Sequence, residues 1–190
     1  PGQAPDGYIN LANASTDSPQ HNPDTTNQIY VDDPCFYIYT SGTTGLPKAG
    51  IFKQNRWMKA YGGFGLMGMQ LGHQDVLYST LPLYHGTGLC VGWGTAIAGA
   101  SGFAIRRKFS ASSFWADTRK FNATAIVYVG ELCRYLMDQP EMPDDASNPV
   151  LKMVGNGLRP NIWGPFKNRF GIEQVLELYA ASDGNIGFAN

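Results

Sequence analysis

Residues 35–48 read CFYIYTSGTTGLPK, a short apolar and aromatic run followed at once by a loop rich in hydroxyl groups and glycine. The run CFYIY has the length and the composition of a buried strand. Two glycines and a proline in the residues that follow exclude regular structure there. We therefore predict a strand that runs directly into a loop.

Further along the chain, apolar runs of strand length alternate with stretches of helical periodicity. Strands are expected near 76–80, 103–106, 125–129, 151–154 and 174–178, and helices near 55–69, after Tyr84, and near 111–121, 131–138 and 161–170. Ser110 is expected to open one helix and Gly171 to close another. Repeated units of strand then helix predict an α/β fold with a mostly parallel sheet covered by helices.

Composition limits the partners and the compartment. The 190 residues carry 14 Lys and Arg against 15 Asp and Glu, which leaves no positive excess for a phosphate backbone. Nucleic acid is therefore not expected as a partner. Cys35, Cys90 and Cys133 lie far apart, so neither a disulfide framework nor a zinc site is expected, and a reducing cytoplasm fits the chain.

The stretch 76–105 contains no charged residue and is long enough to span a bilayer. Pro82, His85 and six glycines interrupt it, however. We predict a strand, a buried helix and a second strand here, with a membrane span as the alternative.

The loop after the first strand has the groups that a polyphosphate requires. Its donors are Thr40, Ser41, Gly42, Thr43, Thr44, Gly45 and Lys48. Hydroxyl and backbone N–H groups, close backbone approach and one mobile cation together predict phosphate binding. The loop is not a Walker A sequence, because Lys48 follows Pro47 and precedes Ala49, so P-loop kinase or GTPase chemistry is disfavoured. A flexible surface loop is the alternative.

The segment YIYTSGTTGLPK at 37–48 resembles the AMP-binding signature of the adenylate-forming superfamily, which includes acyl-CoA synthetases, luciferases and peptide-synthetase adenylation domains. Four later segments are similar to the fatty-acid transport protein and very-long-chain acyl-CoA synthetase family: LPLYH (81–85), VYVGELCRYL (127–136), GNGLRPNIW (155–163) and YAASDGN (179–185). The resemblance implies that 33–190 are part of an ATP/AMP-binding N-terminal domain. It places the C-terminal domain beyond Asn190 and leaves 1–32 as a surface segment or linker.

The reaction implied by this resemblance has two steps. A carboxylate attacks the α-phosphate of ATP to give acyl-AMP and pyrophosphate, and the thiol of coenzyme A then displaces AMP. The expected substrates and cofactors are a long- or very-long-chain fatty acid, ATP, Mg²⁺ and coenzyme A. The protein is expected in the cytoplasm, with peripheral membrane association left open. Two alternatives also stay open: a membrane-associated fatty-acid carrier without catalysis, and an adenylating domain that loads a carrier protein.

The resemblance also implies roles for single residues. The loop would hold the β- and γ-phosphates, with Lys48 and Thr43 acting in catalysis. In the segment 179–185, where the family commonly has YGATEGN, Tyr179 would lie against adenine, the Ser182 hydroxyl would bond the α-phosphate and Asp183 would ligate Mg²⁺. Because Asp is one methylene shorter than Glu, direct and water-mediated ligation both remain open. Taken alone, the string Ser-Asp-Gly-Asn is typical of a turn.

Two further positions are weaker candidates. Gly155, Asn156 and Gly157, with Leu158 beside them, match the segment whose backbone passes the adenine ring, and the alternative is a tight strand-to-helix turn. His85 matches a position that borders the acyl carboxylate and the phosphates, and the alternative is a core or capping residue. Its neighbours Tyr84 and Trp93 would line an acyl pocket or fill the core.

Residues 63–68 satisfy the pattern GxGxxG, but they follow an expected helix instead of a strand. Dinucleotide binding needs a strand before the glycines and an acidic residue after them. These glycines are therefore expected to let a helix pack closely or end early.

Overall fold

The structure is a computed structural model, and it describes residues 4–40, 45–181, 184 and 187–190. The chain divides into two compact units, Pro1–Val31 and Asp32–Asn190. The first unit contains the helix α1 (Leu11–Thr16) and the 3₁₀-helix η1 (Asp24–Gln28), in which no residue is buried. The α1 helix begins after Asn10, whose side chain accepts the N–H of Asn13 at 3.3 Å.

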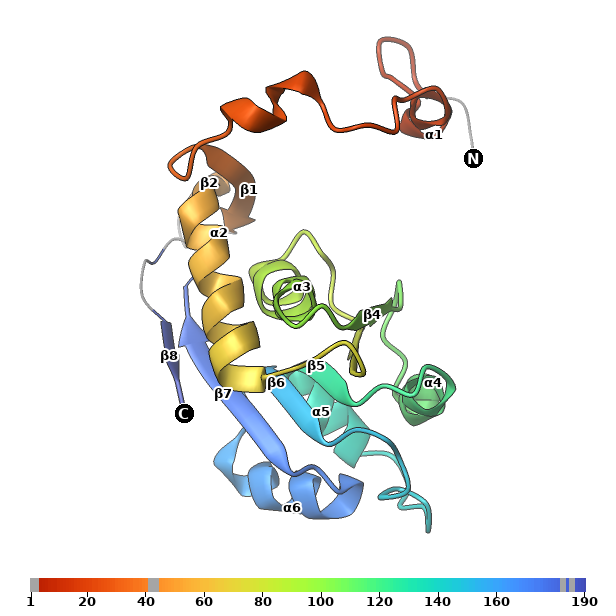
Figure 1. Cartoon of the computed structure of the whole chain (residues 1–190). Coiled ribbons are helices and arrows are strands. Elements are labelled where there is room, and N and C mark those ends of the chain that lie inside the picture. Colours follow the sequence, from red (N-terminus) through yellow and green to blue (C-terminus); the bar gives the residue numbers. More distant parts are fainter. Residues whose placement is uncertain (1–3, 41–44, 182–183, 185–186) are drawn as a thin grey trace. The chain divides into compact units, whose positions relative to one another are not determined.

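The second unit is built on a six-stranded sheet with the order β4-β3-β5-β6-β7-β8 (Figure 1). Its strands are β3 (Val76–Ser79), β4 (Gly102–Ile105), β5 (Ala125–Val129), β6 (Lys152–Asn156), β7 (Gln174–Ala180) and β8 (Gly187–Ala189). The strands β3 to β7 pair in parallel, and only β8 pairs antiparallel, with β7. The predicted mostly parallel sheet is confirmed.

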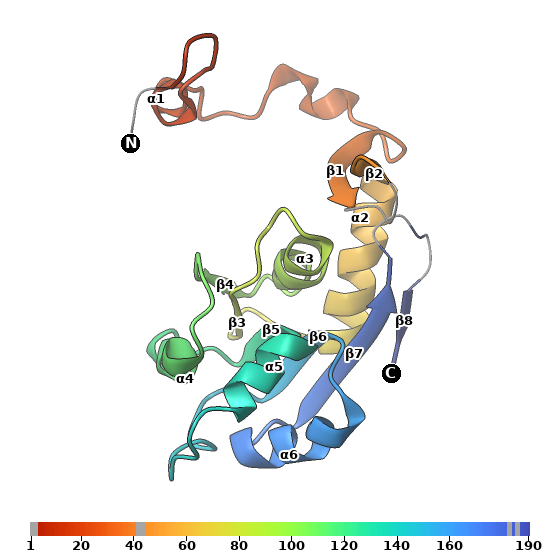
Figure 2. The ribbon, with the colours of Figure 1, turned by 180° about the vertical axis from the view of Figure 1, so that it is seen from behind.

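Helices cover both faces of this sheet (Figures 1 and 2). They are α2 (Gln54–Tyr61) with its π-helical continuation η2 (Gly62–Met69), the π-helical η3 (Thr87–Trp93) with α3 (Gly94–Ala98), the 3₁₀-helix η4 (Ala111–Ser113) with α4 (Phe114–Lys120), α5 (Gly130–Met137) and α6 (Pro160–Phe170). Because side chains alternate along a strand, Tyr78 packs in the core beneath α4, α5 and α6, and its neighbour Leu77 packs beneath η2, η3 and α3.

The helices and strands expected from the sequence are present, and 76–105 forms the predicted strand, buried helix and strand. Gly171 ends α6 in the left-handed conformation with φ of 69°, as predicted. Ser110 lies at the N-cap position of η4 and opens this helix, as expected. Its side chain makes no capping bond to the backbone, and its Oγ donates instead to the Ser113 hydroxyl at 3.2 Å.

The first strand differs from expectation in its pairing. β1 (Pro34–Thr40) pairs antiparallel with β2 (Lys48–Lys53) in a separate two-stranded sheet, so the hydroxyl-rich loop is the turn of a hairpin. The sequence analysis placed no strand after the loop. In β2 only Phe52 is buried and Gly50 lowers the strand propensity, so this strand shows little of the usual pattern.

Two of the three glycines of the GxGxxG pattern, Gly65 and Gly68, serve packing, as predicted, whereas Gly63 has open space around it. A side chain at Gly65 would come within 2.5 Å of the Ala98 Cβ, and one at Gly68 within 2.5 Å of a Leu176 methyl. Both glycines therefore let η2 approach α3 and β7 closely. Among the residues that the structure describes, no helix combines the length and apolarity that a membrane crossing needs.

Candidate active site

The hydroxyl-rich loop is closed at its base by the β1–β2 hairpin. Thr40 and Lys48 are register partners, and the Thr40 Oγ1 donates to the Lys48 carbonyl at 3.4 Å. Gly45 has φ of 110° and open space around its Cα, a conformation that favours glycine. The Lys48 side chain is exposed. The predicted donors Ser41, Gly42, Thr43 and Thr44 lie outside the described residues. In the described part of the loop, the Lys48 side chain and the backbone at Gly45 are therefore accessible to solvent.

Several other predicted residues lie where parallel strands end. Asn156 is the last residue of β6, and Gly157 follows it. Tyr179 lies near the end of β7, and His85 belongs to the segment after β3. Because β3, β6 and β7 run in the same direction, these residues gather at one edge of the sheet. Ligands of open α/β sheets bind outside the carboxyl ends of the strands.

Thr87 connects two of these candidates. Its Oγ1 donates to the Asn156 Oδ1 at 3.3 Å, and its backbone N–H donates to the His85 Nδ1 at 3.2 Å. Thr87 is buried, whereas His85 is exposed. Because Nδ1 accepts a hydrogen bond, the neutral imidazole carries its proton on Nε2. The geometry supports the capping interpretation of His85, and its contact with the acyl carboxylate stays a prediction. Thr87 was missed because a single threonine in an apolar run carries no signal.

The turn after β6 is held by Glu177 of β7. The Glu177 carboxylate accepts the backbone N–H of Gly157 and that of Leu158, the latter at 3.2 Å, together with the hydroxyl of Tyr128. Gly157 has φ of 81°, and a side chain at Gly155 would overlap the Tyr128 backbone. Both glycines are therefore explained by the strand-to-helix turn itself, and their contact with adenine stays a prediction. No local pattern in the sequence marks Glu177 as a functional residue.

The Tyr128 hydroxyl and the Cys133 thiol near Glu177 are both neutral at ordinary pH. Burial and the hydrogen bond to Glu177 raise the pKa of Tyr128 far above its usual value. Burial and the negative charge of Glu177 likewise raise the pKa of the Cys133 thiol. Tyr128 therefore keeps its proton and acts as a hydrogen-bond donor toward the carboxylate.

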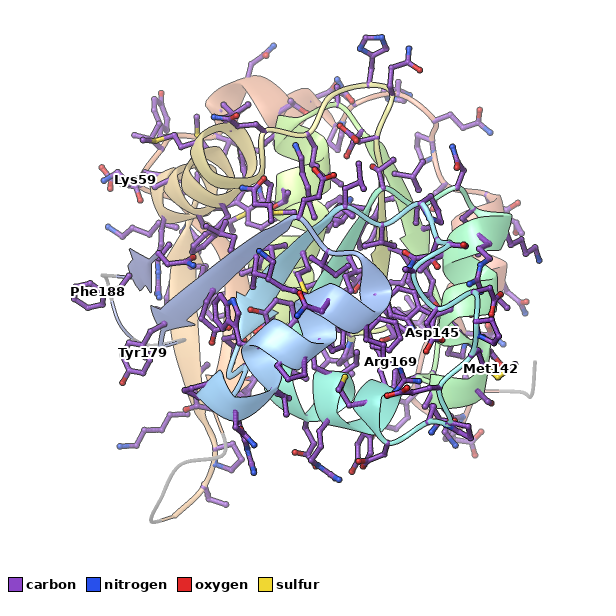
Figure 3. All side chains as sticks on the ribbon, turned by 90° about the horizontal axis from the view of Figure 1, so that it is seen from below. Lys59, Met142, Asp145, Arg169, Tyr179 and Phe188 are labelled. Carbon is purple, nitrogen blue, oxygen red and sulfur yellow. The ribbon has the colours of Figure 1, made fainter. Side chains whose placement is uncertain are left out.

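Tyr179 projects from the edge of the sheet beside Phe188, its register partner in β8 (Figure 3). The two aromatic side chains are 74% and 68% exposed, so Tyr179 is accessible to a planar ligand. Ser182 and Asp183 lie outside the described residues, and their assigned roles stay predictions. Within the described ranges, no group of three or more His, Cys, Asp and Glu side chains forms a metal site.

Arg56 of α2 links the hairpin to the segment 179–185. Its Nη2 donates to the carbonyl of Ala181 at 3.5 Å and to that of Gly184, and its guanidinium lies 3.8 Å from the centre of the Phe52 ring in β2. Arg56 thereby connects β2, the strand that follows the loop, with Ala181 and Gly184. Arg56 was missed because an arginine near the start of an amphipathic helix is typical of a solvated surface.

An open apolar hollow of about 460 Å³ lies beside the base of the loop. Its lining residues are Phe36, Tyr37, Ile38, Tyr39, Leu83, Tyr84 and Leu89. Tyr84 is 84% exposed and lines this hollow. Trp93 instead packs on Trp57, with 5.8 Å between the ring centres. The hollow adjoins Thr40 through Tyr39 and is suited to an apolar group.

A family model and individual relatives match most of the chain. The model of the family "AMP-binding enzyme" matches residues 4–190. Medium/long-chain-fatty-acid–CoA ligase FadD6 of Mycobacterium tuberculosis is 47% identical over 176 residues, covering 93% of this chain and 30% of FadD6. Long-chain fatty acid transport protein 2 of Rattus norvegicus is 46% identical over 165 residues, covering 86% of this chain and 26% of that protein.

A solved structure of the anthranilate CoA ligase AuaEII in complex with anthranoyl-AMP matches with a TM-score of 0.79 at 16% identity, covering 95% of this chain and 35% of that one. At this identity the likeness shows the fold alone. The chain spans 30% of FadD6 and 26% of the rat transport protein.

Proposed function

Because the chain belongs to the AMP-binding enzyme family, we propose that the protein containing it activates a long- or very-long-chain fatty acid with ATP. In the first step a carboxylate oxygen attacks the α-phosphorus, the bond between the α- and β-phosphates breaks, and pyrophosphate leaves. In the second step the sulfur of coenzyme A attacks the acyl carbon, AMP leaves, and the thiol gives up its proton. Residues 33–190 are then part of the ATP/AMP-binding domain, and 1–32 are a surface segment.

The observation that supports this function most is the link made by Arg56. Its hydrogen bonds to Ala181 and Gly184 hold the segment 179–185 next to the helix that follows the hairpin. We propose that the phosphate donors of the loop and the Ser182 hydroxyl act on one nucleotide; Ser41, Gly42, Thr43, Thr44 and Ser182 lie outside the described residues. Donors that are already in place stabilise a departing pyrophosphate without the cost of reorganisation.

The individual roles follow the family pattern. Lys48 and Thr43 stabilise the leaving pyrophosphate, together with Thr40, Ser41, Thr44 and the amides of Gly42 and Gly45. Ser182 binds the α-phosphate. Tyr179 stacks on adenine beside the turn at 155–157, and His85 borders the acyl carboxylate. Asp183 holds Mg²⁺, which neutralises phosphate charge when it is bound.

A fatty acid as substrate is supported by two observations. FadD6, which is 47% identical, is named as a medium/long-chain-fatty-acid–CoA ligase. The hollow beside the loop is apolar and adjoins Thr40 through Tyr39, so an acyl chain placed there would bring its carboxylate toward the phosphates.

The test is exchange of labelled pyrophosphate into ATP by the full-length protein, with acids from medium to very long chain and one aryl acid. We expect exchange that depends on a long fatty acid and is lost in Lys48→Ala. Absence of exchange with every acid would contradict adenylation. Exchange without subsequent acyl-CoA formation would favour a domain that loads a carrier protein.

Fatty-acid transport is a second candidate, because the rat relative at 46% identity is named a transport protein. Flotation of the full-length protein with liposomes tests the membrane association that this role requires. A carrier without catalysis would bind liposomes and show no acid-dependent exchange.

A further inference from the structure

We propose that Glu177 is a positioning residue for the nucleotide: its carboxylate fixes the turn at 156–158 in the shape that receives adenine, and so sets the affinity for ATP. The inference rests on the proposed function. Glu177 acts through the turn and is not assigned contact with the reacting phosphate.

The first observation is an alignment across three strands. Tyr128 of β5 is the register partner of Gly155 in β6, and Gly155 is the register partner of Glu177 in β7. Side chains in register on parallel strands point to the same face of the sheet. Since Gly155 has no side chain, the Tyr128 hydroxyl reaches over it and donates to the Glu177 carboxylate. A residue larger than glycine would block this contact, because its Cβ would lie 2.8 Å from the Tyr128 ring.

The second observation is how the carboxylate engages the turn. Its Oε1 accepts the N–H of Gly157 and, at 3.2 Å, that of Leu158, while its Oε2 lies 3.3 Å from the Leu158 nitrogen. Two successive backbone amides thus point at one anion. Hydrogen bonds with a charged partner are about twice as strong as neutral ones.

The turn is also confined from its other side. A Cβ on Gly130, the first residue of α5, would overlap the carbonyl of Gly157. Gly157 itself needs φ of 81°, which costs other residues about 1 kcal/mol or more. Glu177 on one side and Gly130 on the other therefore restrict the turn to one conformation. Asn156, which accepts the Thr87 hydroxyl, is held in place with the turn.

The hydrogen bonds that the Glu177 carboxylate already accepts exclude two other roles for it, as a general base and as a metal ligand. Both oxygens accept hydrogen bonds from the chain itself, from two amides and one hydroxyl. Taking up a proton as a general base, or coordinating a metal ion, would break these contacts. The Glu177 carboxylate therefore serves to hold the backbone of the turn at 156–158.

The experiment compares three variants of the full-length protein. Glu177→Gln keeps the size and removes the charge, and Tyr128→Phe removes one donor while keeping the ring. Glu173→Gln is the matched control, since Glu173 precedes the same strand and is exposed. The measurements are KM for ATP, KM for the fatty acid and kcat in pyrophosphate exchange, with direct binding of AMP by calorimetry.

We expect Glu177→Gln to raise the KM for ATP and the Kd for AMP about tenfold, with the KM for the acid within about twofold. Tyr128→Phe should shift the same two constants by a smaller factor, and Glu173→Gln should shift neither. An unchanged Kd for AMP in Glu177→Gln, or an equal rise in both KM values, would overturn the proposal. If Glu177→Gln does not fold, an unchanged Kd for AMP in Tyr128→Phe overturns it as well.

Failure of the proposed function has a different signature. A parent protein that binds AMP but shows no acid-dependent exchange would contradict fatty-acid activation. In that case the Kd for AMP in the three variants still decides the role of Glu177.

Discussion

At the scale of single residues, the phosphate-binding loop is the feature most directly open to test. Lys48 is the exposed first residue of β2, and its carbonyl accepts the Thr40 hydroxyl, so its side chain can be removed without disturbing the hairpin. We expect Lys48→Ala and Thr43→Ala to lower the rate of acyl-AMP formation by about 10²–10³ in the full-length protein, the usual effect of losing one charge-stabilising donor.

Thermal unfolding of both variants should match the parent. Lys59→Ala, an exposed lysine on α2, is the control and should keep the parental rate. Acyl-AMP formation at the parental rate in both loop variants would show that the phosphate assignment is wrong.

Asp183 permits a second test at this scale. If it holds Mg²⁺, Asp183→Asn should abolish Mg²⁺-dependent adenylation, and Asp183→Glu should retain or improve it by restoring the longer reach. A residue that only forms a turn would tolerate Asn, because Asn and Asp serve turns about equally well. The measurement is the Mg²⁺ concentration for half-maximal adenylation, and a normal value in Asp183→Asn would refute the metal assignment.

At the scale of elements, the connection between α5 and β6 is anchored by one side chain of α6. Arg169 pairs with Asp145 at 2.6 Å, with the two side chains only 9% and 13% exposed (Figure 3). Its guanidinium also donates to the carbonyls of Met137, Gln139 and Pro140. Removing Arg169 would therefore leave a largely buried carboxylate with only the Met142 N–H as a donor, and would remove a donor from three carbonyls.

We expect Arg169→Ala to lower the free energy of unfolding by about 3–5 kcal/mol, the cost of breaking a buried ion pair from one side. The control is Arg134→Ala, because Arg134 pairs with Glu131 and Asp138 on the exposed face of α5. Its loss should cost less than about 1 kcal/mol. Denaturant unfolding of the 190-residue chain measures the change in the free energy of unfolding for each variant. Equal changes in Arg169→Ala and Arg134→Ala would refute the anchoring role of Arg169.

For the molecule as a whole, the chain spans 30% of FadD6 and 26% of the rat transport protein, and we propose that it carries part of a nucleotide site. We propose that the remaining groups of this site belong to the part of such a protein that the chain does not span. Holding reactants in line contributes about 7–11 kcal/mol to lowering a barrier, and a site without those walls cannot hold them.

We therefore expect this chain alone to bind ATP weakly, seen as line broadening of the Gly42 and Gly45 amide signals. Mass spectrometry should detect no acyl-AMP. Robust formation of acyl-CoA by the purified chain would show that the catalytic groups reside within it.

The strand before the loop and the alternation of strands and helices were predicted from the sequence and are confirmed, whereas the phosphate donors of the loop stay a prediction. These depend on patterns within a few residues, such as the apolar run 35–39 and the glycines beside Lys48. The same local signals predicted the parallel sheet, because repeated strand-then-helix units have one common solution.

The contacts that link the candidate site residues become visible only in the folded chain. Arg56 and Ala181 are 125 positions apart, Thr87 and Asn156 are 69 apart, and Tyr128 and Glu177 are 49 apart. Each of these side chains is ordinary in its local sequence, and β2 lacks a strand pattern of its own. Their roles arise from hydrogen bonds between segments that meet only when the sheet has formed, and no local periodicity records such a contact.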